Sequence, residues 1–222
     1  KAKWIWINSQ QQKDEYGHFK TSIPWKNGDV LLNISCDGNF VVYVNGGVGG
    51  FGQYPDYPNY KIYQQINITP FLKQNEVNTI EILVWHYGIG GTQTYYPAQA
   101  GLIFEIINND QVIDYSQINT LSKLHDNYIS YEEKIITRQL GLSFAYDARN
   151  IERPFSESSL VEKSYLFYKK PIEDFDFNGR LATTKIVEDK HSAVFDLGRQ
   201  SVGFLDLDIY SPKDQKITIT FG

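Results

Sequence analysis

The segment Asp37-Gly38-Asn39-Phe40-Val41-Val42-Tyr43-Val44-Asn45-Gly46 places a short apolar run between two turn signals. Its β-branched and aromatic residues favour a strand over residues 39–44, and the Asp-Gly and Asn-Gly pairs on either side favour tight turns. The same organisation recurs over residues 79–85 and 101–107. Short strands that are separated by Gly, Asn, Asp and Pro predict an all-β chain, folded as an antiparallel β-sandwich.

Later segments of the chain show a sequence pattern with a period of two. Residues 205–209 and 216–221 alternate apolar with polar side chains, which is typical of strands with one buried and one solvated face. Helical signals are limited to short candidates at residues 119–125 and 158–165, and neither has a long amphipathic stripe.

A change of character in the middle of the chain predicts two β domains. We expect a first sandwich over residues 1–126, an irregular polar connector over 127–158 and a second β domain over 159–222. The second domain supplies few strands for its length, and its last strand stops at the end of the chain. Because such a sheet leaves an open edge, we expect it to be truncated or to pair with chain outside this sequence. The absence of Met also indicates an excised piece.

Composition excludes several classes of protein. The chain has 222 residues, of which 15% are aromatic, with a net charge of -5 and a single Cys. No stretch of 18 apolar residues exists, so no membrane span is predicted. One Cys rules out an internal disulfide framework and a Cys-based zinc site, and the acidic balance argues against a nucleic-acid partner. One Cys and no visible signal peptide favour the cytoplasm.

Motifs for catalysis are missing from the sequence. It has no G-x-S-x-G, S-x-x-K or H-E-x-x-H, and the glycine run at residues 46–52 matches no phosphate-binding pattern. No Asp-rich loop demands calcium, so neither a metal nor another cofactor is expected. Asp206 and Asp208 have a spacing that could suit a glycosidase carboxylate pair, but the wet face of a strand explains them better.

Two aromatic runs are the most unusual feature. Residues 54–63 hold four tyrosines and two prolines, and residues 85–96 hold a second cluster. Aromatic faces beside Asn, Asp and Gln suit a sugar ring, whereas Tyr and Trp also favour contacts between domains. Our candidate sugar-binding residues are Trp85, His86, Tyr95 and Tyr96. Our candidates for either an interdomain contact or a sugar contact are Tyr54, Asp56, Tyr57 and Tyr60.

The same residues resemble a known family. Residues 37–46 are similar to the "DGNFELYVNG" type of strand in galactose-binding-like β-sandwiches attached to glycosidases. With residues 50–58, 68–72 and 78–80, the chain resembles the N-terminal region of bacterial α-L-rhamnosidases. Residues 195–204 resemble the "DLGRExVG" segment of the next β domain in that family.

This resemblance implies a galactose-binding-like or jelly-roll first domain. Family members hydrolyse terminal α-L-rhamnosyl groups with inversion, using carboxylates of a C-terminal (α/α)₆ barrel. The resemblance therefore implies that this chain is an accessory region, inactive on its own, whose partners are that catalytic domain and a rhamnosyl glycan or glycoside. No catalytic residue can be carried over to this chain. A stand-alone carbohydrate-binding module and a purely structural scaffold are the alternatives.

Overall fold

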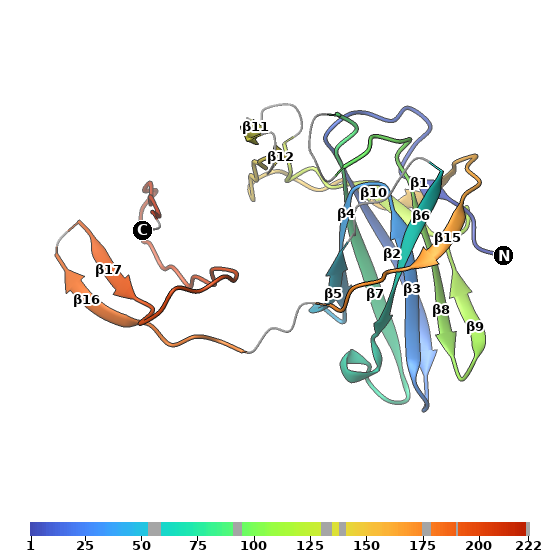
Figure 1. Ribbon diagram of the computed structural model, residues 1–222, viewed down its shortest axis with the longest axis horizontal. Helices are drawn as coiled ribbons and strands as arrows, with labels where there is room; N and C mark the ends of the chain where they lie inside the picture. Colours follow the sequence, from blue (N-terminus) through green and yellow to red (C-terminus); the bar gives the residue numbers. More distant parts are fainter. Residues whose placement is uncertain are drawn as a thin grey trace. The chain divides into compact units, whose positions relative to one another are not determined.

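Two β-sheets pack face to face in the computed structural model (Figure 1). The structure describes residues 1–52, 59–90, 95–129, 135–137, 141–174, 179–189 and 191–220. The chain divides into two compact units, Lys1–Ile172 and Glu173–Gly222, and both sheets of the sandwich belong to the first unit.

The order of strands in each sheet shows many crossovers between the two layers. Sheet 1 runs β14 (Ser159–Leu160), β1 (Ile5–Trp6), β8 (Leu102–Asn108), β3 (Val30–Cys36), β6 (Tyr60–Asn67) and β15 (Leu166–Lys169), with β9 (Gln111–Tyr115) also paired to β8. Sheet 2 runs β13 (Ser156–Glu157), β10 (Leu121–Leu124), β2 (Glu15–Trp25), β7 (Glu76–His86), β4 (Asn39–Val44) and β5 (Gly47–Gly52). A short hairpin of β11 (Ile135–Thr137) and β12 (Gly141–Leu142) stands apart from both sheets.

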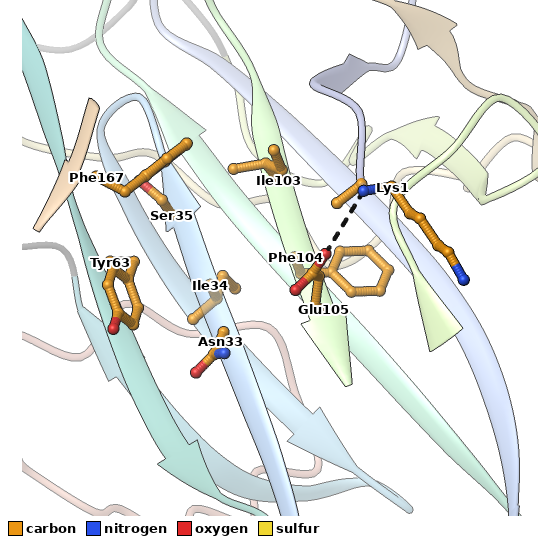
Figure 2. A pocket seen from close by; sticks show the side chains of 10 residues that line it. Lys1, Asn33, Ile34, Ser35, Tyr63, Ile103, Phe104, Glu105 and Phe167 are labelled. Atoms are coloured by element: carbon orange, nitrogen blue, oxygen red, sulfur yellow. Dashed lines mark ion pairs between the residues drawn. The ribbon is translucent and has the colours of Figure 1, made fainter. Parts of the chain in front are cut away.

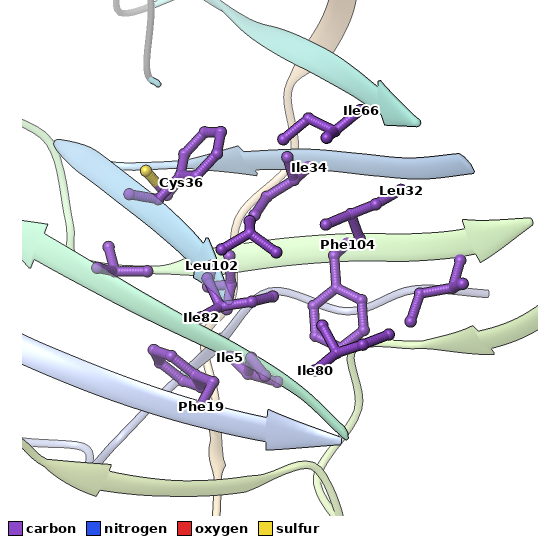
Figure 3. Close-up of a cluster of buried hydrophobic side chains, with 14 of the residues drawn as sticks. Ile5, Phe19, Leu32, Ile34, Cys36, Ile66, Ile80, Ile82, Leu102 and Phe104 are labelled. Carbon is purple, nitrogen blue, oxygen red and sulfur yellow. The ribbon is translucent and has the colours of Figure 1, made fainter. Parts of the chain in front are cut away.

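Alternating apolar residues build the core between the sheets. Strands β4, β7 and β8 coincide with the predicted strands, and every second residue of each is buried. Figure 3 shows side chains from both sheets meeting in this layer. The members of the core from the central strands are Leu32, Ile34, Cys36, Phe40, Val42, Val44, Ile80, Ile82, Val84, Leu102, Phe104 and Ile106. The predicted all-β sandwich is therefore confirmed, and Cys36 is part of its core.

The two short helix candidates were wrong. Residues 119–125 contain strand β10, and residues 158–165 contain β14. In the described residues the helical structure is a single 3₁₀ turn, η1 (Thr69–Phe71), which has Pro70 in its first turn. Strand pairing decided both segments, because a short stretch without its own amphipathic pattern adopts the backbone that a neighbouring strand can bond.

The sandwich extends well beyond residue 126. Strands β13 and β14, from residues 156–160, pair with β10 and β1 at the edges of the two sheets. Strand β15 pairs in parallel with β6, from Leu166 opposite Tyr60 to Lys169 opposite Tyr63. The compact units consequently do not follow the predicted limits at residues 126 and 158.

The second unit contains one hairpin among its described residues. Strands β16 (Thr184–Glu188) and β17 (Ala193–Asp196) pair antiparallel. Residues 205–209 and 216–220, which were predicted as strands, form no ladder, and their apolar side chains are exposed. A strand needs a partner backbone for its N–H and C=O groups, and none pairs with these residues.

Across the described ranges, no helix is long and apolar enough to cross a membrane, and the cytoplasmic location stays a prediction.

Two predicted turns carry backbone conformations that demand glycine or asparagine. Asn45 and Gly46 both have positive φ, 51° and 84°, as expected for the tight hairpin between β4 and β5. Gly38, between β3 and β4, has φ 99°, and a Cβ atom there would lie 2.0 Å from the carbonyl oxygen of Trp85. The turn at Gly38 therefore brings the chain against the end of β7, where the candidate residues lie.

Substitution of Gly38 by alanine should destabilise the sandwich much more than the same change at Gly46. Both residues have positive φ, but a Cβ at Gly46 would meet no atom within 4 Å. We expect Gly46→Ala to cost about 1 kcal/mol of unfolding free energy, from backbone strain alone. Gly38→Ala adds a backbone clash and should cost about 2–4 kcal/mol. Urea unfolding of both variants measures the difference, and equal costs would contradict the close approach at Trp85.

Candidate functional site

A buried carboxylate lies where the two sheets meet at one end of the sandwich. Asp37 directly follows β3, and its backbone N–H donates to the carbonyl oxygen of Gly101 at 2.9 Å. Its side chain is fully buried, although a carboxylate almost never is unless it is paired. Its partners therefore decide what this end of the molecule can do.

Three side chains from separate parts of the chain surround Asp37. His86, the last residue of β7, places Nδ1 2.7 Å from Oδ2, and the hydroxyl of Tyr95 donates to the same oxygen at 2.6 Å. Lys61 of β6 is 2% exposed and places Nζ 3.4 Å from Oδ1. We call these four residues the Asp37 cluster. It ties sheet 1 to sheet 2 and to the segment that carries Tyr95.

Charge and hydrogen bonding keep Asp37 ionised. Burial by itself would raise the pKa of Asp37, but the hydrogen bonds from His86 and Tyr95 and the charge of Lys61 lower it below its ordinary value. The pKa of Tyr95 is raised by burial and by the adjacent carboxylate, so its hydroxyl stays a proton donor to Asp37. The ammonium of Lys61 also lies 5.6 Å from the centre of the Tyr165 ring.

The Asp37 cluster anchors the segments that leave the sandwich here. Besides donating to Asp37, the hydroxyl of Tyr95 accepts the backbone N–H of Gly88 at 3.1 Å. The neighbouring residue, Tyr96, is 56% exposed. The buried network therefore anchors the residue that directly precedes the exposed Tyr96. In the described residues no group of His, Cys, Asp and Glu has the arrangement that would hold a metal ion.

A continuous row of aromatic rings runs along the outer face of sheet 2 to the Asp37 cluster. The rings of Tyr128 and Tyr16 stack at 4.3 Å, and Tyr16 stacks on Trp85 at 5.2 Å. Tyr87 then makes edge contacts with Trp85 at 4.5 Å and with Tyr95 at 5.1 Å. Contacts of this kind prefer offset or edge-on geometry and add to the burial of the rings.

Polar contacts fix this aromatic row in place. The indole N–H of Trp85 donates to Oδ1 of Asp14 at 2.7 Å, and the amide of Asn39 donates to the hydroxyl of Tyr87 at 2.7 Å. Burial raises the pKa of Tyr87 to about 12, so its hydroxyl keeps its proton. These bonds hold Trp85 and Tyr87 in a row in which Tyr16 is buried.

The candidates from the second aromatic run fall on both faces of sheet 2. His86 and Tyr95 meet at Asp37, whereas Trp85 lies on the outer face and reaches Tyr95 only through Tyr87. Consecutive residues of a strand point to opposite faces, so Trp85 and His86 cannot line one surface. Tyr96, which follows Tyr95 in the chain, is exposed.

The first aromatic run is only partly described. Tyr54, Asp56 and Tyr57 lie outside the described residues. Tyr60 makes an edge contact of 5.3 Å with Tyr168 of β15, so its ring packs between neighbouring strands of sheet 1.

Two residues at the centre of this site, Asp37 and Lys61, were not among the candidates predicted from the sequence. In the sequence Asp37 belongs to a turn signal, and Lys61 lies within an aromatic run. One signal was available for Lys61. It is the single charged residue of β6, and the other side chains of this strand are apolar, aromatic or amide-bearing. Nothing in the local pattern pointed to Tyr16 or Asp14 as partners of Trp85.

Solved structures of rhamnosidases have the same fold. A GH78 family rhamnosidase of Bacillus sp. GL1 is 22% identical over 78% of this chain and 20% of that chain, with a TM-score of 0.71. The α-L-rhamnosidase of Dictyoglumus thermophilum is 15% identical over 89% of this chain and 25% of that chain, with a TM-score of 0.59. No protein-family model and no curated protein sequence matches the chain.

This chain has the fold of a β region of rhamnosidases. It spans about a fifth to a quarter of the length of the two rhamnosidases that it matches. The resemblance of the chain to the N-terminal β region of rhamnosidases is therefore confirmed at the level of fold. Identities of 22% and 15% carry the fold and nothing about activity or ligand.

Proposed function

We propose that this chain is a non-catalytic accessory β region of an α-L-rhamnosidase-like glycoside hydrolase. In this role it braces a C-terminal (α/α)₆ catalytic domain and contacts carbohydrate at the end of the sandwich near Asp37. The fold shared with two rhamnosidases over most of this chain supports the parent enzyme class. The observation that carries the carbohydrate contact is the exposed Tyr96 beside the anchored Tyr95 and the aromatic row.

The chemistry of the site suits a neutral sugar. An aromatic ring offers a flat apolar face to the C–H side of a pyranose, and neighbouring amides bond its hydroxyls. Asp37 has its carboxylate engaged inside the protein and is no candidate acid or base for glycosidic cleavage. Accordingly, the chain alone should release no rhamnose from an aryl α-L-rhamnoside, and measurable release would overturn the non-catalytic role.

Titration of the chain with L-rhamnose, followed by tryptophan fluorescence, tests the carbohydrate contact. We expect a saturable signal in the millimolar range, because Trp85 belongs to the aromatic row that ends near Tyr96. Tyr96→Ala should weaken binding by about 5–10-fold, which corresponds to the loss of one aromatic contact. Tyr210→Ala is the matched control, because Tyr210 is also an exposed tyrosine but lies in the second unit.

Two outcomes separate this proposal from its alternatives. A flat response at millimolar rhamnose would reject the sugar contact and leave the bracing role alone. A stand-alone carbohydrate-binding module is the second candidate, favoured by the same exposed tyrosine. Binding by this chain that is as tight as binding by the whole parent protein would support the module.

A further inference from the structure

A groove on the outer face of sheet 1 has the composition of a second ligand site. It has a volume of 360 Å³, which is at the small end of the range for ligand pockets (Figure 2). Strands β3, β6, β8 and β15 supply its walls and floor, so all of it belongs to the first unit. The side chains that line it include Asn33, Ser35, Tyr63, Ile103, Glu105 and Phe167. None of these residues belongs to the Asp37 cluster or the aromatic row.

A polar row runs from strand to strand, and two of its members, Asn33 and Glu105, line the groove. In the strand register Glu105 of β8 lies opposite Asn33 of β3, and Asn33 lies opposite Gln65 of β6. The amide of Gln65 donates to Oδ1 of Asn33 at 3.0 Å, and Lys169 of β15 donates to Oε1 of Gln65 at 3.1 Å. Within the described residues, these bonds leave the amide NH₂ of Asn33 and the carboxylate of Glu105 as donor and acceptor for a ligand.

Aromatic and aliphatic side chains flank this polar row. Phe167 is 40% exposed although it stacks on Trp4 at 6.0 Å, so one part of the ring is supported and another part is open. Tyr63 lies beside it on β6, and Ile103 lies across the groove on β8. Figure 2 shows these side chains around the groove, with Asn33 on β3 and Glu105 on the neighbouring β8.

The charges around the groove favour a neutral occupant. Glu105 brings one carboxylate, and the ammonium of Lys169 is already bonded to Gln65. The α-amino group of Lys1 is 4.0 Å from Glu105, but it is well exposed and such pairs contribute little. An anionic ligand would meet the carboxylate of Glu105, and a cation would find only this one carboxylate. A polyol needs a donor, an acceptor and a flat apolar surface, and the groove has all three.

We propose that this groove binds one pyranose residue of a neutral glycan, with its C–H face on Phe167 and its hydroxyls on Asn33 and Glu105. The site is a carbohydrate site separate from the one near Tyr96. The choice of sugar rests on the proposed function, whereas the position of the site rests on the residues of the groove.

Nuclear magnetic resonance of the ¹⁵N-labelled chain tests the proposal. The probes are methyl α-L-rhamnopyranoside and methyl β-D-galactopyranoside at millimolar concentration. We expect saturable shifts of the backbone amides of Asn33, Ile103 and Glu105. Phe167→Ala should reduce the affinity at these amides at least fivefold, as loss of an aromatic contact predicts. Because Phe167 also packs on Trp4, Glu105→Gln is the second variant, which keeps the shape and removes an ionised acceptor, and it should weaken binding severalfold.

Tyr96→Ala distinguishes this site from the one near Asp37. It should leave the groove shifts unchanged, whereas Glu105→Gln should leave any shifts near Tyr96 unchanged. Shifts confined to the surroundings of Tyr96 would overturn the groove site and keep the proposed function. Groove shifts that persist in both Phe167→Ala and Glu105→Gln would overturn it as well, as would the absence of any shift with both sugars.

Discussion

Replacement of Asp37 by alanine should lower the free energy of unfolding by about 3–5 kcal/mol, because it leaves buried charged and polar partners without their acceptor. The side chain of Lys61 is 2% exposed, and both the imidazole of His86 and the hydroxyl of Tyr95 bond the same carboxylate oxygen. Removal of the carboxylate takes this acceptor away from all three groups. Chemical unfolding monitored by tryptophan fluorescence measures the loss. Asp208→Ala, which changes an exposed Asp in the second unit, should alter stability by less than about 0.5 kcal/mol.

A double-mutant cycle separates the buried ion pair from a general loss of packing. Asp37→Asn keeps the shape of the side chain and removes its charge, and Lys61→Met removes the opposite charge while it keeps an apolar stem. If the two charges depend on each other, the double variant should be more stable than the sum of the single changes predicts, by about 1–3 kcal/mol. Additive losses would show that Asp37 stabilises the sandwich through His86 and Tyr95 alone.

The position of the exposed Tyr96 depends on the buried Asp37 cluster. The hydroxyl of Tyr95 bridges Asp37 and the backbone of Gly88, and Tyr96 is the next residue. A variant of Asp37 should therefore weaken any sugar contact of Tyr96 as well as stability. For this reason Tyr96→Ala, and not a variant of Asp37, is the informative change for binding.

Local patterns in the sequence predicted the central strands because the cause there is local. Residues 39–44 and 79–85 are rich in β-branched and aromatic residues, and turn residues lie next to residues 39–44, so each segment favours a strand by itself. Asp37 and Gly38 were predicted as a turn for the same reason. Residues 121–124 and 159–160 have no such pattern. They are strands only because β2 and β1 offer them backbone partners.

The candidate site depended on contacts between distant residues, which the sequence could not supply. The partners of Asp37 are 24, 49 and 58 residues away along the chain. Aromatic density near residues 85–96 drew attention to this end of the sandwich. It could not show that His86 faces the core while Trp85 faces Tyr16, because that depends on which face of β7 is covered.

Acidification should destabilise the sandwich between pH 7 and pH 5, because two half-buried histidines favour their neutral form in the folded chain. His18 of β2 and His125, just after β10, stack at 5.4 Å. Phe155 covers His18, and Tyr128 covers His125, at 5.1 Å in both cases. The Nδ1 atom of each imidazole is buried without a hydrogen-bond partner in the described part of the chain. A proton placed on the Nδ1 atom of either ring would therefore have no hydrogen-bond acceptor there.

The charged groups around the pair act in both directions. Glu81 of β7 lies 3.8 Å from His18, and Glu152 pairs with Lys123 of β10, which lies opposite His18 in the register and two residues before His125. Burial, followed by Lys123 and His125, outweighs the two carboxylates and lowers the pKa of His18 to about 4. Burial lowers the pKa of His125 in the same direction.

Remaining charges near the pair do not change this balance. Lys20 of β2 lies over the Phe155 ring, and Asp126 pairs with Arg153. Asp126 raises the pKa of His125, but less than burial lowers it. The stacked rings therefore stay neutral at pH 7.

The sign of the pH effect follows from proton binding. The unfolded chain binds protons at His18 with a pKa near 6.5, whereas the folded chain does so near 4. The stability that the neutral ring provides is complete above pH 6.5 and is lost as the pH falls toward 4. For His18 alone this amounts to about 2 kcal/mol between pH 7 and pH 5. A carboxylate with a lowered pKa, such as that of Asp37, stabilises the folded chain until the pH falls below about its ordinary pKa. Such groups therefore do not change the stability between pH 7 and pH 5.

Urea unfolding at pH 7 and pH 5 tests this expectation. The quantity compared between variants is the slope, by which we mean the change in unfolding free energy between the two pH values, and not the stability at either pH. His18→Gln removes a titrating group, so its loss between the two pH values should be smaller than that of the unchanged chain by about 2 kcal/mol, even if the variant is less stable at pH 7. His125→Gln should reduce the slope in the same direction. His191→Gln changes an exposed histidine of the second unit and should leave the slope unaltered. A slope that His18→Gln and His191→Gln leave equally unchanged would mean that water or rearranged side chains already satisfy the charged form of His18, and that the aromatic cover over sheet 2 opens without cost.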